Sequence, residues 1–240
     1  SLKLITNKIQ KKSYDKWISR FDDLMKIEFE KVINSDLNPK KDGITMGESI
    51  IAINEFTNGD AIIVTDVGQH QMVACRYANF IKSKSNITSG CLGTMGFALP
   101  AAMGAKMGAL NREVVAVIGD GGYQMTIQEL GTIFQQQIPV KIVVLNNDFL
   151  GMVRQWQQLF YDERYKETPI SSPDYVKLSE AYGLKGLRVK KRSEISDAIK
   201  LAESINGPVL VEFIVEQHDM VYPMVATGSD LNDMISRPVH

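Results

Sequence analysis

The chain has 240 residues, of which 44% are hydrophobic and 23% are charged, and its formal net charge is −1. This size and composition suit a globular domain with a sizeable core. The nearly neutral charge argues against a nucleic-acid partner, and no apolar run approaches the roughly 20 residues that span a bilayer. Cys75 and Cys91 are too few and too far apart for a zinc site or a disulfide framework. We therefore expect a cytoplasmic protein with neither nucleic-acid nor membrane partners.

The first 43 residues resemble the end of a preceding domain. Residues 1–12 are basic and lack periodicity, which predicts a loose leader. Residues 13–32 place apolar side chains mostly on one face of a helix, and 38–43 form a polar linker. We expect residues 1–43 to be a linker and helix from a preceding domain, and 44–240 to be the main domain of a fragment.

Strands and helices alternate along the main domain. The predicted strands are mostly continuously apolar, which is typical of strands buried on both faces by crossover helices. We therefore predict an α/β fold, a doubly wound parallel sheet with helices on both faces. The predicted strands are 61–65, 114–118, 140–145, 187–189 and 209–215; the predicted helices are 47–56, 71–80, 97–109, 126–136, 151–160, 174–182, 193–204 and a short one ending the tail at 218–234; and 161–173 is predicted to be an exposed polar loop.

Two polar turns carry the strongest functional signal. Gly119-Asp120-Gly121-Gly122 follows one apolar strand and Asn146-Asn147 follows the next, with one helix between the strands. Such a unit makes the two strands parallel, so Asp120 and Asn147 emerge at one edge of the sheet. Each turn alone is ordinary. Together they offer an anionic and a neutral oxygen to Mg²⁺, with the carbonyl of Phe149 as a third ligand, on a phosphate-bearing molecule.

Nearby backbone groups are suited to phosphate. Glycines in the first turn carry no Cβ, so their backbone permits close approach. Gly151 and Met152 open one helix, and Gln69 and His70 open another. Free N–H groups at such helix starts donate to phosphate oxygens.

Four blocks of the sequence resemble the catalytic subunit of acetolactate synthase (acetohydroxyacid synthase), in that family's order. They are DVGQHQM at 66–72, GTMGFALPAA at 93–102, LNNDFLGMVRQWQ at 145–157 and VYPMV at 221–225. The resemblance implies the pyrophosphate-binding domain of the thiamine-diphosphate-binding fold. It also implies an enzyme of branched-chain amino acid biosynthesis, which condenses pyruvate with a second 2-keto acid and releases CO₂.

The resemblance implies roles for individual residues. Met95 would hold thiamine in its bent conformer, and the carbonyl of Gly93 would accept a hydrogen bond from the aminopyrimidine. Met152 and Trp156 would border the substrate pocket, although both residue types more often fill cores. The implied cofactor-binding residues are Gln69, His70, Gly93, Met95, Gly119, Asp120, Gly121, Gly122, Asn147, Phe149, Leu150, Gly151 and Met152, and the implied metal ligands are Asp120, Asn147 and Phe149.

Other parts implied by the resemblance have no match in the chain. The family's activating glutamate belongs to an N-terminal domain of the partner subunit, and FAD is held by a middle domain. We therefore assign no catalytic residue here and expect the isolated chain to bind thiamine diphosphate weakly and to be inactive. The resemblance implies a homo-oligomer, a dimer or a dimer of dimers, and leaves a regulatory small subunit open. A pyruvate oxidase, a 2-keto-acid decarboxylase and a non-catalytic binding or assembly module stay open as alternatives.

Overall fold

The computed structural model describes residues 2–10 and 12–238, which form two compact units. Pro39–Val221 form one unit, which contains the sheet, and the residues before and after it form the other. Among the described residues, none of the helices combines the length and apolar character that crossing a membrane requires.

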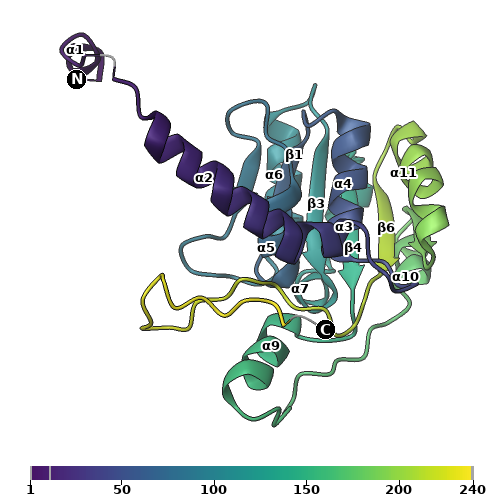
Figure 1. Ribbon diagram of the computed structural model, residues 1–240. Helices are drawn as coiled ribbons and strands as arrows, with labels where there is room; N and C mark the ends of the chain where they lie inside the picture. Colours follow the sequence, from purple (N-terminus) through teal and green to yellow (C-terminus); the bar gives the residue numbers. More distant parts are fainter. Residues whose placement is uncertain (1, 11, 239–240) are drawn as a thin grey trace. The chain divides into compact units, whose positions relative to one another are not determined.

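A parallel sheet of six strands, in the order β2-β1-β3-β4-β6-β5, is the frame of the larger unit (Figure 1). The chain runs outward from β1 to β2, returns to β3 beside β1, and continues to β4 on the other side. It then crosses to β5 at the far edge and returns to β6, between β4 and β5. This is the predicted doubly wound arrangement. Ligands bind where such an order reverses, which here is at the carboxyl ends of β1 and β3. The strands are β1 (Ile62–Thr65), β2 (Asn86–Thr88), β3 (Val114–Gly119), β4 (Lys141–Asn146), β5 (Lys185–Val189) and β6 (Val209–Ile214).

Helices cover both faces of the sheet. One face packs against α4 (Met46–Thr57), α5 (Gln69–Tyr77) and α11 (Ile195–Ser204), which follows the short 3-10 helix η2 (Arg192–Glu194). The other packs against α6 (Ala98–Gly108), α8 (Glu129–Gln136) and α10 (Tyr175–Ala181). Two further helices, α7 (Asp120–Met125) and α9 (Gly151–Phe160), follow β3 and β4 at the carboxyl edge.

The core depends on strand alternation. Alternate residues of β1, β3, β4 and β6 point to the same face and join α6, α8 and α10 in one buried cluster. The small side chains of α6, Ala98 and Ala102 among them, are fully buried and allow the helix to lie close to the strands. These helices thus bury one face of the sheet, whose carboxyl edge carries the turns that follow the strands.

Some predicted elements are wrong in detail. Strand β2 was not predicted. The first polar turn is helical, as α7, and the predicted helix 126–136 begins only at Glu129. Residues 126–128 form a turn between α7 and α8, where Thr126 has φ −133° and its hydroxyl donates to the carbonyl of Gly96 at 3.0 Å. The described tail, 218–238, contains no helix; its order comes from an antiparallel bridge between Met224 and Ile235.

The smaller unit begins with α1 (Leu2–Thr6), inside the predicted loose leader. The predicted helix 13–32 is realised as α2 (Asp15–Glu28), followed by the π-helix η1 (Phe29–Ile33) and α3 (Asn34–Leu37). No residue of α2 is buried, and Trp17 is 64% exposed. Within this unit, Arg237 pairs with Asp36 at 2.6 Å.

Candidate functional site

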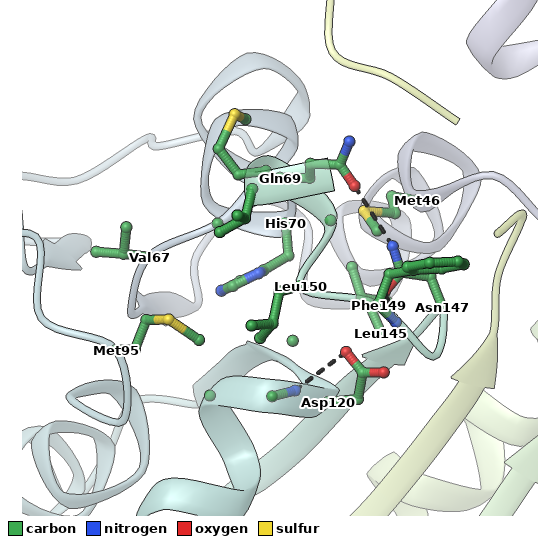
Figure 2. Close-up of a pocket in the computed structure, with 17 residues that line it drawn as sticks. Met46, Val67, Gln69, His70, Met95, Asp120, Leu145, Asn147, Phe149 and Leu150 are labelled. Atoms are coloured by element: carbon green, nitrogen blue, oxygen red, sulfur yellow. Dashed lines mark hydrogen bonds between the residues drawn. The ribbon is translucent and has the colours of Figure 1, made fainter. Parts of the chain in front are cut away.

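The predicted metal ligands lie at the carboxyl edge of the sheet, after neighbouring strands. β3 and β4 pair in parallel, with Gly119 opposite Leu145. Asp120 follows β3 as the first residue of α7, and Asn147 follows β4 directly. Both residues line one pocket (Figure 2). The carboxylate and the amide predicted for this edge of the sheet therefore line the same pocket.

The carboxylate of Asp120 is buried, with one oxygen left unused. The residue is 2% exposed. Its Oδ1 accepts a hydrogen bond from the Gly121 amide at 3.1 Å, whereas Oδ2 is buried without a hydrogen-bond partner among the described residues. Burial raises the pKa of Asp120 to about 7, and the charge of Asp148 adds to the rise, which nearby backbone N–H groups oppose. A cation at Oδ2 would offset the cost of burying this charge.

Asn147 presents an amide oxygen beside this carboxylate. Its Nδ2 donates to Gln69 Oε1 at 3.4 Å, which orients the amide. Its Oδ1 accepts the Phe149 N–H at 3.3 Å and retains a second lone pair. Asp148, between them, has φ +54°, so the chain turns sharply at this point. The amide oxygen is thus held at the pocket with capacity to bind a metal.

The carbonyl of Phe149 is the third predicted ligand. Phe149 forms an antiparallel bridge with Pro169, flanked by backbone hydrogen bonds of 3.0 and 2.8 Å between the residues on either side. This makes Phe149 and Pro169 a non-hydrogen-bonded pair, whose own N–H and C=O groups point away from the partner segment. The Phe149 N–H accordingly meets Asn147 Oδ1. Its carbonyl points to the same side and is free to bind a cation.

The same bridge adds one detail to the predicted exposed polar loop at residues 161–173. Residues 161–167 are exposed and the segment contains no helix or strand, as predicted. Thr168 departs from the prediction, because it is fully buried against the turn after β4. A local reading of polar residues misses this docking, because backbone groups of the turn supply the partners.

A second buried carboxylate holds the start of α5. Asp66 is fully buried, its Oδ1 lies 2.5 Å from His70 Nε2, and its Oδ2 accepts the Gly96 N–H at 2.8 Å. His70 therefore has one ring nitrogen engaged. Only Nδ1, which lies beside Gly119, is left for a ligand, and it donates only when the imidazole is protonated at both nitrogens. The prediction that the His70 side chain donates to phosphate therefore applies only to Nδ1, and only in the doubly protonated form of the ring.

Gln69 is fixed at both ends of its amide. Its Nε2 donates to Gln155 Oε1 at 2.9 Å and to the Asp219 carbonyl at 3.0 Å, and its Oε1 accepts from Asn147. Gln155, which is fully buried on α9, also forms two hydrogen bonds with the backbone of Val221 at 2.8 and 2.9 Å. With its side chain so engaged, Gln69 has its backbone N–H at the start of α5 as the group suited to an anion.

Two glycines of the predicted set are required by close packing. A Cβ on Gly122 would overlap Oδ2 of Asp66, and a Cβ on Gly151 would overlap Oε1 of Gln69. Both glycines therefore let a helix start pass against a buried polar side chain. The structure supplies a packing reason for residues that the sequence suggested for phosphate approach.

The pocket brings together most of the predicted residues. Gly93 and Trp156 are the predicted residues absent from its lining. Gly93 has φ +63° in an exposed loop, and Trp156 packs against Phe160 with ring centroids 4.7 Å apart and ring planes tilted by 45°. The predicted residues that line the pocket are Gln69, His70, Met95, Gly119, Asp120, Gly121, Gly122, Asn147, Phe149, Leu150, Gly151 and Met152.

Five lining residues were not predicted: Met46, Val67, Gly68, Leu145 and Val153. Four of them lie inside the sequence blocks 66–72 and 145–157, at most two positions from a predicted residue. Met46 carries no such signal. It reaches the pocket because Thr45 caps α4, where its hydroxyl accepts the Glu48 N–H at 3.1 Å.

The donor set fits a small, hard divalent cation. In the described part of the chain, no cluster of three or more His, Cys, Asp or Glu side chains is suited to a metal. One carboxylate, one amide oxygen and one carbonyl are instead the ligands that Mg²⁺ accepts when phosphate and water complete its shell. The unpartnered Oδ2 of Asp120 is the observation that most directly points to such an ion.

Comparisons with known proteins agree with this geometry. The chain is 48% identical over 204 residues to an acetolactate synthase of Mycobacterium bovis, covering 82% of this chain and 33% of that protein. It is 42% identical over 198 residues to the acetolactate synthase large subunit of Lactococcus lactis, covering 82% and 34%. It thus spans about a third of the length of these curated relatives.

A solved structure and a family match extend the comparison. A thiamine diphosphate-dependent 4-hydroxybenzoylformate decarboxylase of Rhodococcus jostii superposes with a TM-score of 0.68 at 27% identity, over 73% of this chain and 33% of that one. Residues 66–213, which contain the turns after β1, β3 and β4, match the family described as thiamine pyrophosphate enzyme, C-terminal TPP binding domain. This chain belongs to that family.

Proposed function

We propose that this chain is the cofactor-binding part of an acetolactate synthase, which condenses pyruvate with a second 2-keto acid and releases CO₂. Relatives of that name, 42% and 48% identical to this chain, support the proposal. The single observation that carries the cofactor half of it is the buried, unpartnered Oδ2 of Asp120 beside Asn147. Residues 44–240 form the cofactor-binding domain, and 1–43 end a preceding domain.

Mg²⁺ is bound by Asp120, Asn147 and the carbonyl of Phe149. Asp120 contributes the negative charge, and the metal supplies the positive charge that its buried carboxylate lacks. Asn147 and Phe149 add neutral oxygens that leave room for phosphate oxygens and water. Because the pKa of Asp120 is raised to about 7, a proton competes with Mg²⁺ for this carboxylate below about pH 7.

The helix starts at α5, α7 and α9 bind the diphosphate. Their first backbone N–H groups lack helical partners and donate to anions. Gly122 and Gly151 let two of these starts pack against buried side chains, which fixes their position. Met95, with Val67 and Leu150, forms an apolar wall that excludes water from the thiamine moiety. When bound, thiamine diphosphate supplies the electron sink for decarboxylation of a 2-keto acid.

Met152 borders the 2-keto acids, and Trp156, one turn further along α9, affects the choice of the second. The described residues that line the pocket include no glutamate, so the activating acid comes from another part of the assembly. The site is then completed in a homo-oligomer, a dimer or a dimer of dimers, and FAD is bound by other parts of the protein. The name "large subunit" of one relative supports a smaller regulatory partner. We also propose that the protein acts in the cytoplasm.

A 2-keto-acid decarboxylase is the second candidate, because the Rhodococcus jostii neighbour has that activity in its name. Its identity of 27% is well below the 48% of the Mycobacterium bovis relative, which favours the synthase. Product analysis decides between them. The natural polypeptide that carries this sequence, given Mg²⁺, thiamine diphosphate and pyruvate, is expected to form acetolactate. Formation of acetaldehyde without acetolactate would refute the synthase.

The isolated chain gives a second test. We expect it to bind thiamine diphosphate weakly and only with Mg²⁺, and to form no acetolactate. Calorimetric titration measures the first property and product analysis the second. Submicromolar binding together with acetolactate formation by this chain alone would contradict the split site.

A further inference from the structure

We infer that Glu212 is a positioning residue of the metal site: acting through Asn146, it fixes the turn that presents Asn147 and Phe149 to the ion. This inference rests on the proposed function, since it concerns the same Mg²⁺ site. Glu212 itself does not line the pocket. Its role follows from an uninterrupted set of hydrogen bonds, from β5 through β6 to the turn after β4.

Glu212 is an unexpected residue for its place in the sheet. It lies within the apolar strand β6, is 1% exposed, and points to the same face of the sheet as Leu210. Both of its oxygens have partners. Oε2 accepts from Arg188 Nε at 2.6 Å, on the neighbouring strand β5, and Oε1 accepts from Asn146 Nδ2 at 2.8 Å, at the end of β4. A buried carboxylate persists when it is satisfied in this way.

Asn146 transmits this contact to the metal-binding turn. Its other amide atom, Oδ1, accepts the Asp148 N–H at 3.1 Å. Asp148 has φ +54°, a conformation that residues other than glycine adopt at a cost, so this hydrogen bond stabilises an unfavourable backbone. Asn147 and Phe149, the proposed ligands, lie on either side of Asp148. Their oxygens are correctly placed only when this turn is held.

The orientation of the Asn146 amide is set by the chemistry of Glu212. An ionised carboxylate only accepts hydrogen bonds, so it selects the NH₂ end of Asn146. The carbonyl end is thereby directed to the Asp148 N–H. A group at position 212 that donates to Asn146 would select the opposite orientation and place NH₂ against N–H. The buried carboxylate thus determines the polarity of the whole set of hydrogen bonds.

This dependence on polarity gives a specific test in the 240-residue chain. Glu212→Gln keeps the size of the side chain, but its oxygen faces Arg188 and its NH₂ faces Asn146, so the Asn146 amide reverses and releases Asp148. Asn146→Asp alone places a second buried carboxylate against that of Glu212, and the two repel each other. The double variant E212Q/N146D restores an acceptor for every donor at unchanged total charge, because the new carboxylate at position 146 accepts both from the new amide at position 212 and from the Asp148 N–H. A general loss of packing would not be repaired by this exchange.

Two measurements follow the turn. Hydrogen exchange of the Asp148 amide, measured without ligands, should be faster in E212Q and return to the wild-type rate in the double variant. The Mg²⁺ concentration that half-saturates thiamine diphosphate binding should rise roughly ten- to hundredfold in E212Q, the range found when groups supporting metal ligands are removed, and recover in the double variant. Circular dichroism and thermal melting show that each variant is folded.

Asp174→Asn is the matched control. Asp174 is the other carboxylate partner of Arg188, at 2.6 Å, and it has no contact with Asn146 in this set of hydrogen bonds. The variant also removes one charge next to Arg188, and the Asn that it introduces can still cap α10. Both measurements should stay within twofold of wild type. An equal effect of D174N and E212Q would overturn the inference, because the cause would then be the charge of Arg188.

The outcomes separate this inference from the proposed function. Mg²⁺-dependent binding in wild type that is unchanged in E212Q overturns the role of Glu212 and leaves the proposed metal site intact. Binding of thiamine diphosphate in wild type without any dependence on Mg²⁺ refutes the proposed site and the role of Glu212 together. Loss in both single variants and recovery in the double variant is the expected result.

Discussion

Replacing Asp120 by Asn separates the electrostatic cost of this carboxylate from its shape. Asn keeps the hydrogen bond that Oδ1 accepts from the Gly121 amide at 3.1 Å. The variant removes a buried negative charge whose second oxygen has no hydrogen-bond partner among the described residues. With a chelator present, we expect D120N to be more stable than wild type at alkaline pH. When Mg²⁺ is added instead, we expect it to stabilise wild type but not D120N.

The magnitude follows from the pKa of Asp120, which burial raises from 3.8 to about 7. Between these values the folded chain keeps a proton that the unfolded chain releases, so wild-type stability falls as pH rises, and the fall is complete above about pH 7. The difference corresponds to about 4 kcal/mol. The Asn amide leaves an unpartnered NH₂ at a cost of about 1–2 kcal/mol at every pH. D120N should therefore be roughly 2–3 kcal/mol more stable than wild type at pH 8 and about 1–2 kcal/mol less stable at pH 4.

Urea unfolding at pH 4 to 8, with a chelator and then with Mg²⁺, measures this difference. Asp174→Asn is the opposite control: hydrogen bonding to Arg188 lowers the pKa of Asp174, so this carboxylate stabilises the fold above its ordinary pKa and loses that effect as pH falls. A D120N effect that does not change with pH would refute the raised pKa. Undiminished stabilisation of D120N by Mg²⁺ would refute Asp120 as a ligand.

Three further predictions concern other parts of the chain. Gly122→Ala places a Cβ on Oδ2 of Asp66 and should lower the free energy of unfolding by about 2 kcal/mol; equal or higher stability in urea would contradict the close contact. Lys141→Met removes hydrogen bonds to three carbonyls near the end of α11 and should cost about 1–3 kcal/mol, with faster hydrogen exchange in that helix as the check. Trp156→Leu should leave thiamine diphosphate binding within twofold, because Trp156 does not line the pocket, but alter the ratio of products from pyruvate and 2-ketobutyrate in the natural polypeptide; an unchanged ratio would remove it from the substrate site.

The fold was predictable where local pattern and tertiary structure agree. β3 is continuously apolar, β4 contains the apolar run 142–145, and the helical stretch between them implies their parallel pairing. Elements decided by distant partners were not predictable. β2 has three residues, Asn86–Thr88, and exists because it pairs with β1. At the break between α7 and α8, the Thr126 hydroxyl donates to the Gly96 carbonyl, thirty positions away in the sequence, and no local propensity encodes this contact.

The site divides in the same way. Side chains directly after strands could be placed from sequence, because parallel strands bring their carboxyl ends to one edge. The sequence pattern gives no indication of the groups that orient those side chains. Glu212 lies 65 positions from Asn147 in an otherwise ordinary apolar strand, and Thr168 belongs to a segment that reads as a polar loop. Their contribution comes from three-dimensional hydrogen bonding, which leaves no periodic signal.

Two segments carry the proposed metal ligands, the Asp120 arm after β3 and the Asn147 arm after β4. Both are held by residues on the face of the sheet that packs against α10. The Asp120 arm is anchored by Tyr175 of α10, whose hydroxyl donates to the Asp120 carbonyl at 3.0 Å, and burial raises the pKa of Tyr175 to about 12, which keeps it a donor. The Asn147 arm is anchored by Glu212 of β6 through Asn146. Described residues that line the pocket come from other elements. Sensitivity of metal binding should therefore extend to Tyr175 and Glu212, because these two residues hold the segments that carry the carboxylate and the amide oxygen.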